Sequence, residues 1–71
     1  MNAKDWIKVE DRLPDRIEGL NVTMNVLVYH KGCLSMAWYS YKQGEKCWCN
    51  TMGWRISEVT HWMPIVFPKE D

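Results

Sequence analysis

Six residues near the C-terminus, Val59-Thr60-His61-Trp62-Met63-Pro64, limit most strongly what this chain can fold into. Valine, threonine and tryptophan favour an extended, half-buried backbone, and Pro64 keeps Met63 extended while donating no hydrogen bond to a sheet. The sequence therefore predicts a β-strand that ends at Pro64. Because side chains alternate along a strand, Trp62 points to one face and His61 to the other. We expect Trp62 to anchor a core.

The length of 71 residues predicts a single domain, with an ordered core over about residues 5–67. A domain of this size buries only about 60% of the surface that its unfolded chain exposes. Five Trp, three Tyr and one Phe compensate, since each buried aromatic removes roughly 150–250 Å² from water. We therefore expect aromatic rings to supply much of the core.

Short apolar or alternating stretches predict further strands at residues 6–9, 23–30, 33–41 and 46–50. Lys31-Gly32 predicts a hairpin turn, and residues 54–56 predict a short extended piece or a loop. Residues 15–19 allow one helical turn, because Pro14 precedes them and Gly19 can cap it. No helix-period stripe of useful length occurs elsewhere. The predicted fold is mainly β, a small antiparallel meander of four or five strands.

Apolar residues occupy both faces of the two longest predicted strands. In a sheet with one solvent-exposed face, polar residues would occupy that face. We therefore expect something to cover the second face. We also expect the two ends of the chain to meet, with indole rings from both ends holding a thin sheet closed. The residues predicted to lie in or beside the core are Trp6, Leu13, Val26, Val28, Trp54 and Trp62.

Nine acidic and nine basic side chains give a formal net charge of zero, which argues against a strongly basic nucleic-acid binder or a polybasic membrane anchor. No apolar run approaches the roughly 18–20 residues of a membrane span, and residues 1–10 contain no apolar signal segment. Three cysteines, an odd number, fit reduced thiols better than a disulfide framework. We expect a cytoplasmic protein.

Two blocks of sequence, residues 6–14 and 59–64, together with Val26-Leu27-Val28 and Trp54, resemble the domain of unknown function 551 family. The resemblance spans nearly the whole chain. It implies a small protein from a phage, prophage or other mobile element, and it carries over no catalytic residue. The positions that match the motifs, and to which we assign structural roles, are Trp6, Asp11, Leu13, Pro14, Trp54, Thr60, Trp62 and Pro64.

His61 has two interpretations. As a functional group, it acts as a ligand or transfers protons, assisted by Glu10 or Asp11. As a structural group, its imidazole is hydrogen-bonded to the backbone or to that carboxylate and ties the two chain ends together. The structural interpretation is favoured, because no nucleophile or metal partner can be identified.

Cys33, Cys47, Cys49, His30 and His61 could together supply four zinc ligands. However, one residue separates Cys47 from Cys49, which is shorter than the spacer of a zinc knuckle, and the sequence contains no second pair of closely spaced ligands. We therefore assign no metal and no cofactor, and treat the thiols as small apolar groups.

Aromatic and basic residues interleave between positions 38 and 55, which suggests two uses. Aromatic rings on one exposed face could stack against the bases of single-stranded nucleic acid, while lysines bind its phosphates. Rings left exposed could instead bury against a protein partner or a second copy of the chain, and this second use is favoured. The candidate binding residues are Trp38, Tyr39, Tyr41, Trp48, Arg55 and His61.

No phosphate-binding loop, paired-carboxylate signature or serine elbow is present, so we expect no enzyme. The sequence favours a non-catalytic protein-interaction module that binds a protein partner or forms a homo-oligomer. Single-stranded nucleic-acid binding is the alternative, and a zinc-binding domain or a small enzyme using His61 ranks below it.

Overall fold

A tight hairpin forms the centre of the fold. In the computed structural model, which describes residues 5–65, β2 (Val26–His30) and β3 (Cys33–Ser40) pair across Lys31-Gly32. Both turn residues have positive φ, 50° and 77°. This conformation matches the right-handed twist of the flanking strands, and glycine adopts it without a steric penalty. The predicted hairpin turn is confirmed.

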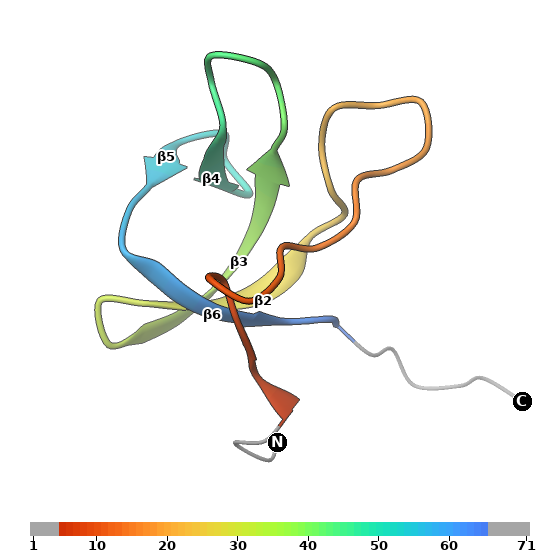
Figure 1. Ribbon diagram of the computed structural model, residues 1–71. Helices are drawn as coiled ribbons and strands as arrows, with labels where there is room; N and C mark the ends of the chain where they lie inside the picture. Colours follow the sequence, from red (N-terminus) through yellow and green to blue (C-terminus); the bar gives the residue numbers. More distant parts are fainter. Residues whose placement is uncertain (1–4, 66–71) are drawn as a thin grey trace, which may run out of the picture.

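Four further strands complete one antiparallel sheet: β1 (Ile7–Lys8), β4 (Cys47–Asn50), β5 (Arg55–Ile56) and β6 (Val59–Met63). The spatial order is β1-β6-β2-β3-β4-β5. Strands β2 to β5 follow one another as a meander, and the chain then crosses back so that β6 lies between β1 and β2 (Figure 1). The mainly antiparallel β class is confirmed. The sheet has six strands rather than four or five, because Arg55–Ile56, in the segment predicted as an extended piece or a loop, pairs with β4 as β5.

The two ends of the described chain meet, as predicted. Ile7 lies opposite Trp62 in the pairing of β1 with β6, and the Val9 N–H donates to the Thr60 carbonyl at 2.9 Å. The Trp62 indole Nε1–H donates to the Arg12 carbonyl at 2.7 Å, and the Arg12 guanidinium lies 5.5 Å from the centre of the ring. Trp62 therefore fixes the segment after β1 as well as filling the core.

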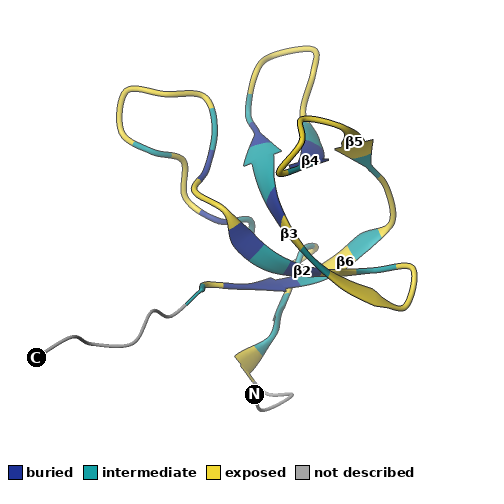
Figure 2. Ribbon diagram, turned by 180° about the vertical axis from the view of Figure 1, so that it is seen from behind, coloured by how far each residue is buried: buried dark blue, intermediate teal, exposed yellow. Residues whose placement is uncertain are grey.

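The core lies on one side of the bent sheet (Figure 2). Register explains its composition, because Val28 lies opposite Trp62 on one side and Ser35 on the other, and directly opposite residues share a face. The buried core residues are Val26, Val28, Ala37, Trp48 and Trp62, with Ile7, Val9, Leu13, Tyr39, Ile56 and Val59 packed against them. The predicted core positions Leu13, Val26, Val28 and Trp62 are confirmed.

Two predicted core residues lie elsewhere. Trp54 is 69% exposed, because it stands in the turn between β4 and β5 and not within a strand. Trp6 directly precedes β1. Because Ile7 faces the core, Trp6 faces the other side of the sheet, where its ring packs edge-on against Tyr29 at a centroid distance of 6.4 Å. The prediction that both indoles join the core is wrong.

The predicted helical turn at residues 15–19 is also wrong, because this segment forms a loop that bonds to itself and to β3. The Ile17 N–H donates to the Val22 carbonyl at 2.8 Å, and Gly19 has a φ of +83°. Buried Thr23 then fastens the loop to Tyr39: its Oγ1 accepts from the Tyr39 N–H at 2.9 Å, and its own N–H donates to the Tyr39 carbonyl at 3.0 Å. Five residues of helix could not outweigh these bonds, since an isolated short helix is unstable.

The end of the predicted ordered core, beyond residue 65, lies outside the described residues. A search of the described part of the chain for a helix with the length and apolarity needed to cross a bilayer finds none.

Candidate interaction surface

The sheet has a second face, opposite the core, that we call the outer face. Tyr29 pairs with Leu34 in β3 and with His61 in β6, and Leu27 pairs with Met36, so these side chains share it. Leu34 is 59% exposed and Met36 is 41% exposed. Within the described residues, the expected cover for this face is therefore missing over the β2–β3 hairpin, whose tip is exposed in Figure 2.

A rigid turn presents the two most exposed large apolar side chains of the described chain, Met52 (80%) and Trp54 (69%). The Asn50 Oδ1 atom accepts from the N–H groups of Met52 and Trp54 at 3.0 and 2.9 Å. The Asn50 N–H donates to the Trp54 carbonyl at 2.8 Å, and the Gly53 N–H donates to the Asn50 carbonyl at 2.9 Å. The backbone that carries this exposed indole is thus fixed before any partner binds.

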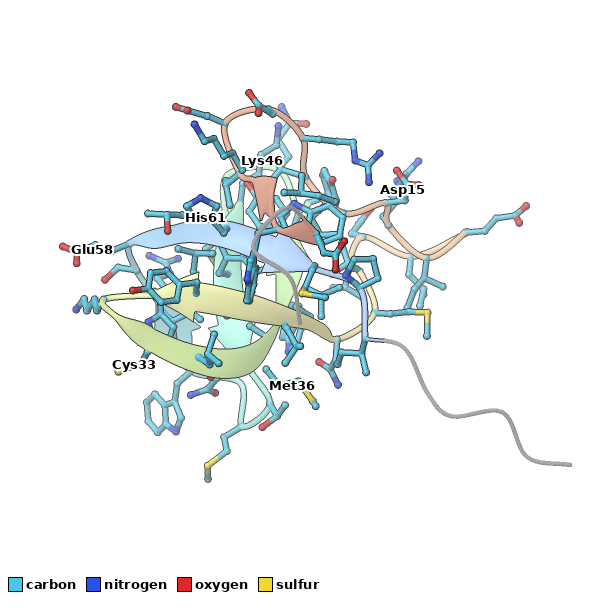
Figure 3. All side chains as sticks on the ribbon, turned by 90° about the horizontal axis from the view of Figure 1, so that it is seen from below. Asp15, Cys33, Met36, Lys46, Glu58 and His61 are labelled. Carbon is cyan, nitrogen blue, oxygen red and sulfur yellow. The ribbon has the colours of Figure 1, made fainter. Side chains whose placement is uncertain are left out.

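The turn and the outer face adjoin each other. Ala37 pairs with Asn50 in an antiparallel register, so the residues after Asn50 start beside Met36. Figure 3 shows the Met36 and Cys33 side chains along the rim of the β2–β3 hairpin. We call Tyr29, Leu34, Met36, Met52 and Trp54 the apolar patch. None of its side chains carries a charge.

The predicted binding residues do not come together. Tyr39 packs edge-to-face against Tyr41 and Trp48, with ring centroids 5.0 and 5.2 Å apart. These three rings hold the structure together, and the Tyr41 hydroxyl donates to the carbonyl of buried Pro14 at 2.6 Å. Trp38 pairs with Cys49, which pairs with Arg55, so this group lies on the outer face.

His61 also lies on the outer face, half-buried against the edge of Tyr29 at a centroid distance of 6.3 Å. Its Nδ1 is 2.9 Å from the Thr60 hydroxyl, which donates to the Tyr29 carbonyl at 3.4 Å. The imidazole therefore has a neighbouring hydroxyl as its partner, where we expected the backbone or the carboxylate of Glu10 or Asp11. Glu10 and His61 do line one open hollow of about 350 Å³, together with Lys8, Val9, Val59 and Thr60.

The other motif positions have structural roles. The Asp11 N–H donates to the Lys8 carbonyl at 3.0 Å, which closes the turn after β1. Pro64 directly follows the last residue of β6, where it ends the strand as predicted.

The cysteines and His30 are divided between the two ends of β3. Cys33 pairs with His30 at the hairpin, whereas Cys47 pairs with Ser40. Seven residues of strand separate these points, roughly 23 Å at about 3.3 Å per residue. Within residues 5–65 no group of three or more His, Cys, Asp or Glu side chains is placed to hold a metal ion. His30 is half-buried, and its buried Nδ1 has no hydrogen-bond partner among residues 5–65.

Cys47 and Cys49 lie next to each other, with their Sγ atoms 3.8 Å apart. They line an open hollow of about 410 Å³ with Trp38, Lys42 and Arg55 among its other walls. Burial raises the pKa of the Cys49 thiol, the Cys47 thiol adds to that shift, and Arg55 opposes it. Cys49 is therefore held as a neutral thiol, while Cys33 is exposed.

The Tyr41 hydroxyl makes stability depend on alkaline pH. Burial raises its pKa above the ordinary value of 10.0, and Tyr39 and Asp15 add to the shift. The unfolded chain then loses this proton at lower pH than the folded chain, so the contribution is complete below about pH 10 and is lost as the pH rises further. We expect the difference in unfolding free energy between wild type and Tyr41→Phe to be constant from pH 7 to 9 and to shrink above pH 10. Urea unfolding at several pH values measures it, and a constant difference up to pH 11 would contradict the assignment.

Sequence reasoning missed Leu34, Met36 and Met52 as surface residues. The signal for the turn was present, because Asn50 and Gly53 stand at the positions where a hairpin loop needs a side-chain acceptor and a positive φ. No comparable local signal marks which face of β3 stays exposed.

Comparison with known proteins yields one match. A family model described as a protein of unknown function (DUF551) matches residues 5–69. No curated protein and no solved structure gives a significant match to the chain.

Proposed function

This chain belongs to the domain of unknown function 551 family, whose description assigns no activity, and we propose that it is a non-catalytic protein-interaction module. It buries the apolar patch against another protein chain. The family resemblance supports an origin in a phage or other mobile element, and three free thiols support a cytoplasmic setting.

The observation that carries the proposal is the exposed indole of Trp54 on a backbone fixed by four hydrogen bonds. Tryptophan is enriched among the residues that dominate binding energy at protein interfaces. A segment whose backbone is already ordered also loses less entropy on binding than a mobile one. Leu34 and Met36 extend the exposed apolar surface around it.

Trp54→Ser tests the proposal. We use the tagged wild-type protein as bait in a lysate of the cells that carry its gene, and compare it with Trp54→Ser and with Leu20→Ser. Leu20 is also exposed, at 51%, but lies in the loop between β1 and β2. We expect the wild type and Leu20→Ser to recover the same partner chain, and Trp54→Ser to recover at least tenfold less. Equal recovery by all three proteins would exclude the apolar patch as the binding surface.

Single-stranded nucleic acid is the second candidate, and the hollow beside Cys47 favours it. Half-buried Trp38 lines this hollow together with Arg55 and Lys42. Glu45 lines it as well and pairs with Lys42 at 3.3 Å, so Arg55 is the cation left to meet a phosphate beside the ring. This candidate requires tryptophan fluorescence to be quenched by a short oligonucleotide, with an affinity that falls steeply as salt rises. An unchanged spectrum at low salt removes it.

A further inference from the structure

The strand β4 presents two thiols on one face. Side chains two residues apart in a strand point the same way, so Cys47 and Cys49 both face away from the core, whereas Trp48 between them packs into it. The two Sγ atoms are 3.8 Å apart. Both residues pair with β3, and Cys49 also pairs with β5. The two sulfur atoms are therefore positioned by a sheet and not by a loop.

The pair can be reached from solvent. Both thiols line the open hollow of about 410 Å³ described above. Cys47 is half-buried, whereas Cys49 is only 8% exposed. A small ion between the two sulfur atoms is therefore enclosed by protein on the side of Cys49 and accessible on the side of Cys47.

The strand disfavours a direct bond between the two sulfur atoms. Two residues of strand place the Cα atoms roughly 6.6 Å apart, close to the upper limit of about 6.8 Å for a disulfide. The Sγ atoms, at 3.8 Å, also lie well beyond the length of an S–S bond, about 2.05 Å. Cys47 and Cys49 are therefore better placed to share an ion than to bond to each other.

The number of ligands selects the ion. Thiolates favour Cu(I), zinc and iron–sulfur clusters. Structural zinc and iron–sulfur clusters take four protein ligands, but no third His, Cys, Asp or Glu joins the pair within residues 5–65. Two thiolates alone satisfy Cu(I). At a metal–sulfur bond of about 2.3 Å, as for zinc, one ion bridges sulfur atoms up to roughly 4.6 Å apart, and the spacing of 3.8 Å lies within this reach.

We propose that Cys47 and Cys49 form a two-coordinate site for monovalent copper. Two S–H bonds are replaced by two S–Cu bonds, both protons pass to the solvent, and no electron is transferred. The site goes beyond the interaction module, since no residue of the apolar patch is a ligand.

A cation beside the pair matches the charge of the bound complex. Two thiolates and one Cu(I) together carry a single negative charge. Arg55 lies opposite Cys49 in the pairing of β4 with β5 and lines the same hollow, so its guanidinium offsets this charge. Lys42 lines the hollow too, but it is already paired with Glu45 at 3.3 Å.

Anaerobic titration of the reduced full chain with Cu(I), in competition with the coloured chelator bicinchoninate, tests the site. We expect the wild type to bind one ion per chain. Cys33→Ser removes the exposed thiol at the other end of β3 and should bind like the wild type. Cys47→Ser removes one ligand at a half-buried position and should bind at least tenfold more weakly. Urea unfolding of the metal-free proteins checks that both variants are folded.

A second pair of variants tests the role of Arg55 while leaving both thiols in place. Arg55→Gln should weaken Cu(I) binding severalfold without changing its stoichiometry, whereas Lys31→Gln, the same loss of charge at the β2–β3 turn, should not. Wild-type affinity in Cys47→Ser, or weakened binding in Cys33→Ser, would overturn the site. So would half an ion per chain, or zinc bound as tightly as Cu(I) when each metal is added alone.

Discussion

Trp62→Ala should remove a large part of the protein's stability at 25 °C. Trp62 is 3% exposed, and truncation of a buried tryptophan costs about 3–5 kcal/mol. A 71-residue domain has a total stability of roughly 4–10 kcal/mol, at about 0.05–0.15 kcal/mol per residue. The loss is therefore at least about a third of the total free energy of unfolding, and at the lower end of this range it equals the whole of it. Far-ultraviolet circular dichroism during urea unfolding measures it.

Trp62→Phe separates the packing of the ring from the bond that it donates. Phenylalanine keeps an aromatic ring opposite Ile7 and Val28 but leaves the Arg12 carbonyl without the indole N–H. We expect an intermediate stability, about 1–3 kcal/mol below the wild type. If Trp62→Ala were as stable as the wild type, the meeting of the chain ends would have no energetic importance, and our account of the fold would be wrong.

Trp48→Ala should have the second largest effect, about 3–5 kcal/mol. Trp48 is 6% exposed and lies opposite both Tyr39 and Ile56, so it joins the three strands at the other end of the sheet. Its edge-to-face contact with Tyr39, at an interplanar angle of 68°, adds to the burial. Tyr39 also packs against Tyr41. Loss of the Trp48 ring therefore also weakens the packing that positions the Tyr41 hydroxyl for its hydrogen bond to the Pro14 carbonyl.

The matched control is Trp54→Ala, which removes the same side chain from an exposed turn. We expect its unfolding free energy to stay within about 0.5 kcal/mol of the wild type. Thermal unfolding of the two variants under one buffer condition compares them directly. A Trp54→Ala variant that is destabilised as much as Trp48→Ala would show that the exposed indole has a structural role, and would weaken the case for its role in binding.

The elements that the sequence predicts correctly are those with local causes. Lys31-Gly32 supplies the positive φ angles of a two-residue turn, and Pro64 stops β6 whatever lies beside it. The strand propensity and alternation of residues 59–63 also predict that Trp62 is buried, and it is 3% exposed. The helical turn at residues 15–19 failed because the bonds that decide the loop come from Thr23, Tyr39 and other residues distant in sequence.

The location of each tryptophan could be predicted only where a strand could. Trp62 stands within a strand whose alternation sends it to the core, as predicted. Trp48, which we counted among the binding residues, is also buried, whereas Trp54 occupies a turn, and its family motif does not reveal that. The candidate binding residues show the same limit. Interleaved aromatic and basic residues predict one shared face only if the strand register is known, and the register divides Tyr39 and Trp48 from Trp38 and Arg55.

The position of β6 between β1 and β2 has a consequence for how the protein is made. β6 is the last of the six strands to be synthesised, and both β1 and β2 need it as a neighbour, so the sheet cannot be completed until residue 63 has left the ribosome. Pairings so distant in sequence also slow folding, because the intervening chain must first be brought together. A nascent chain that stops before Val59 exposes Ile7 and Val28 at once, and quality-control proteases would meet it as an unfolded polypeptide.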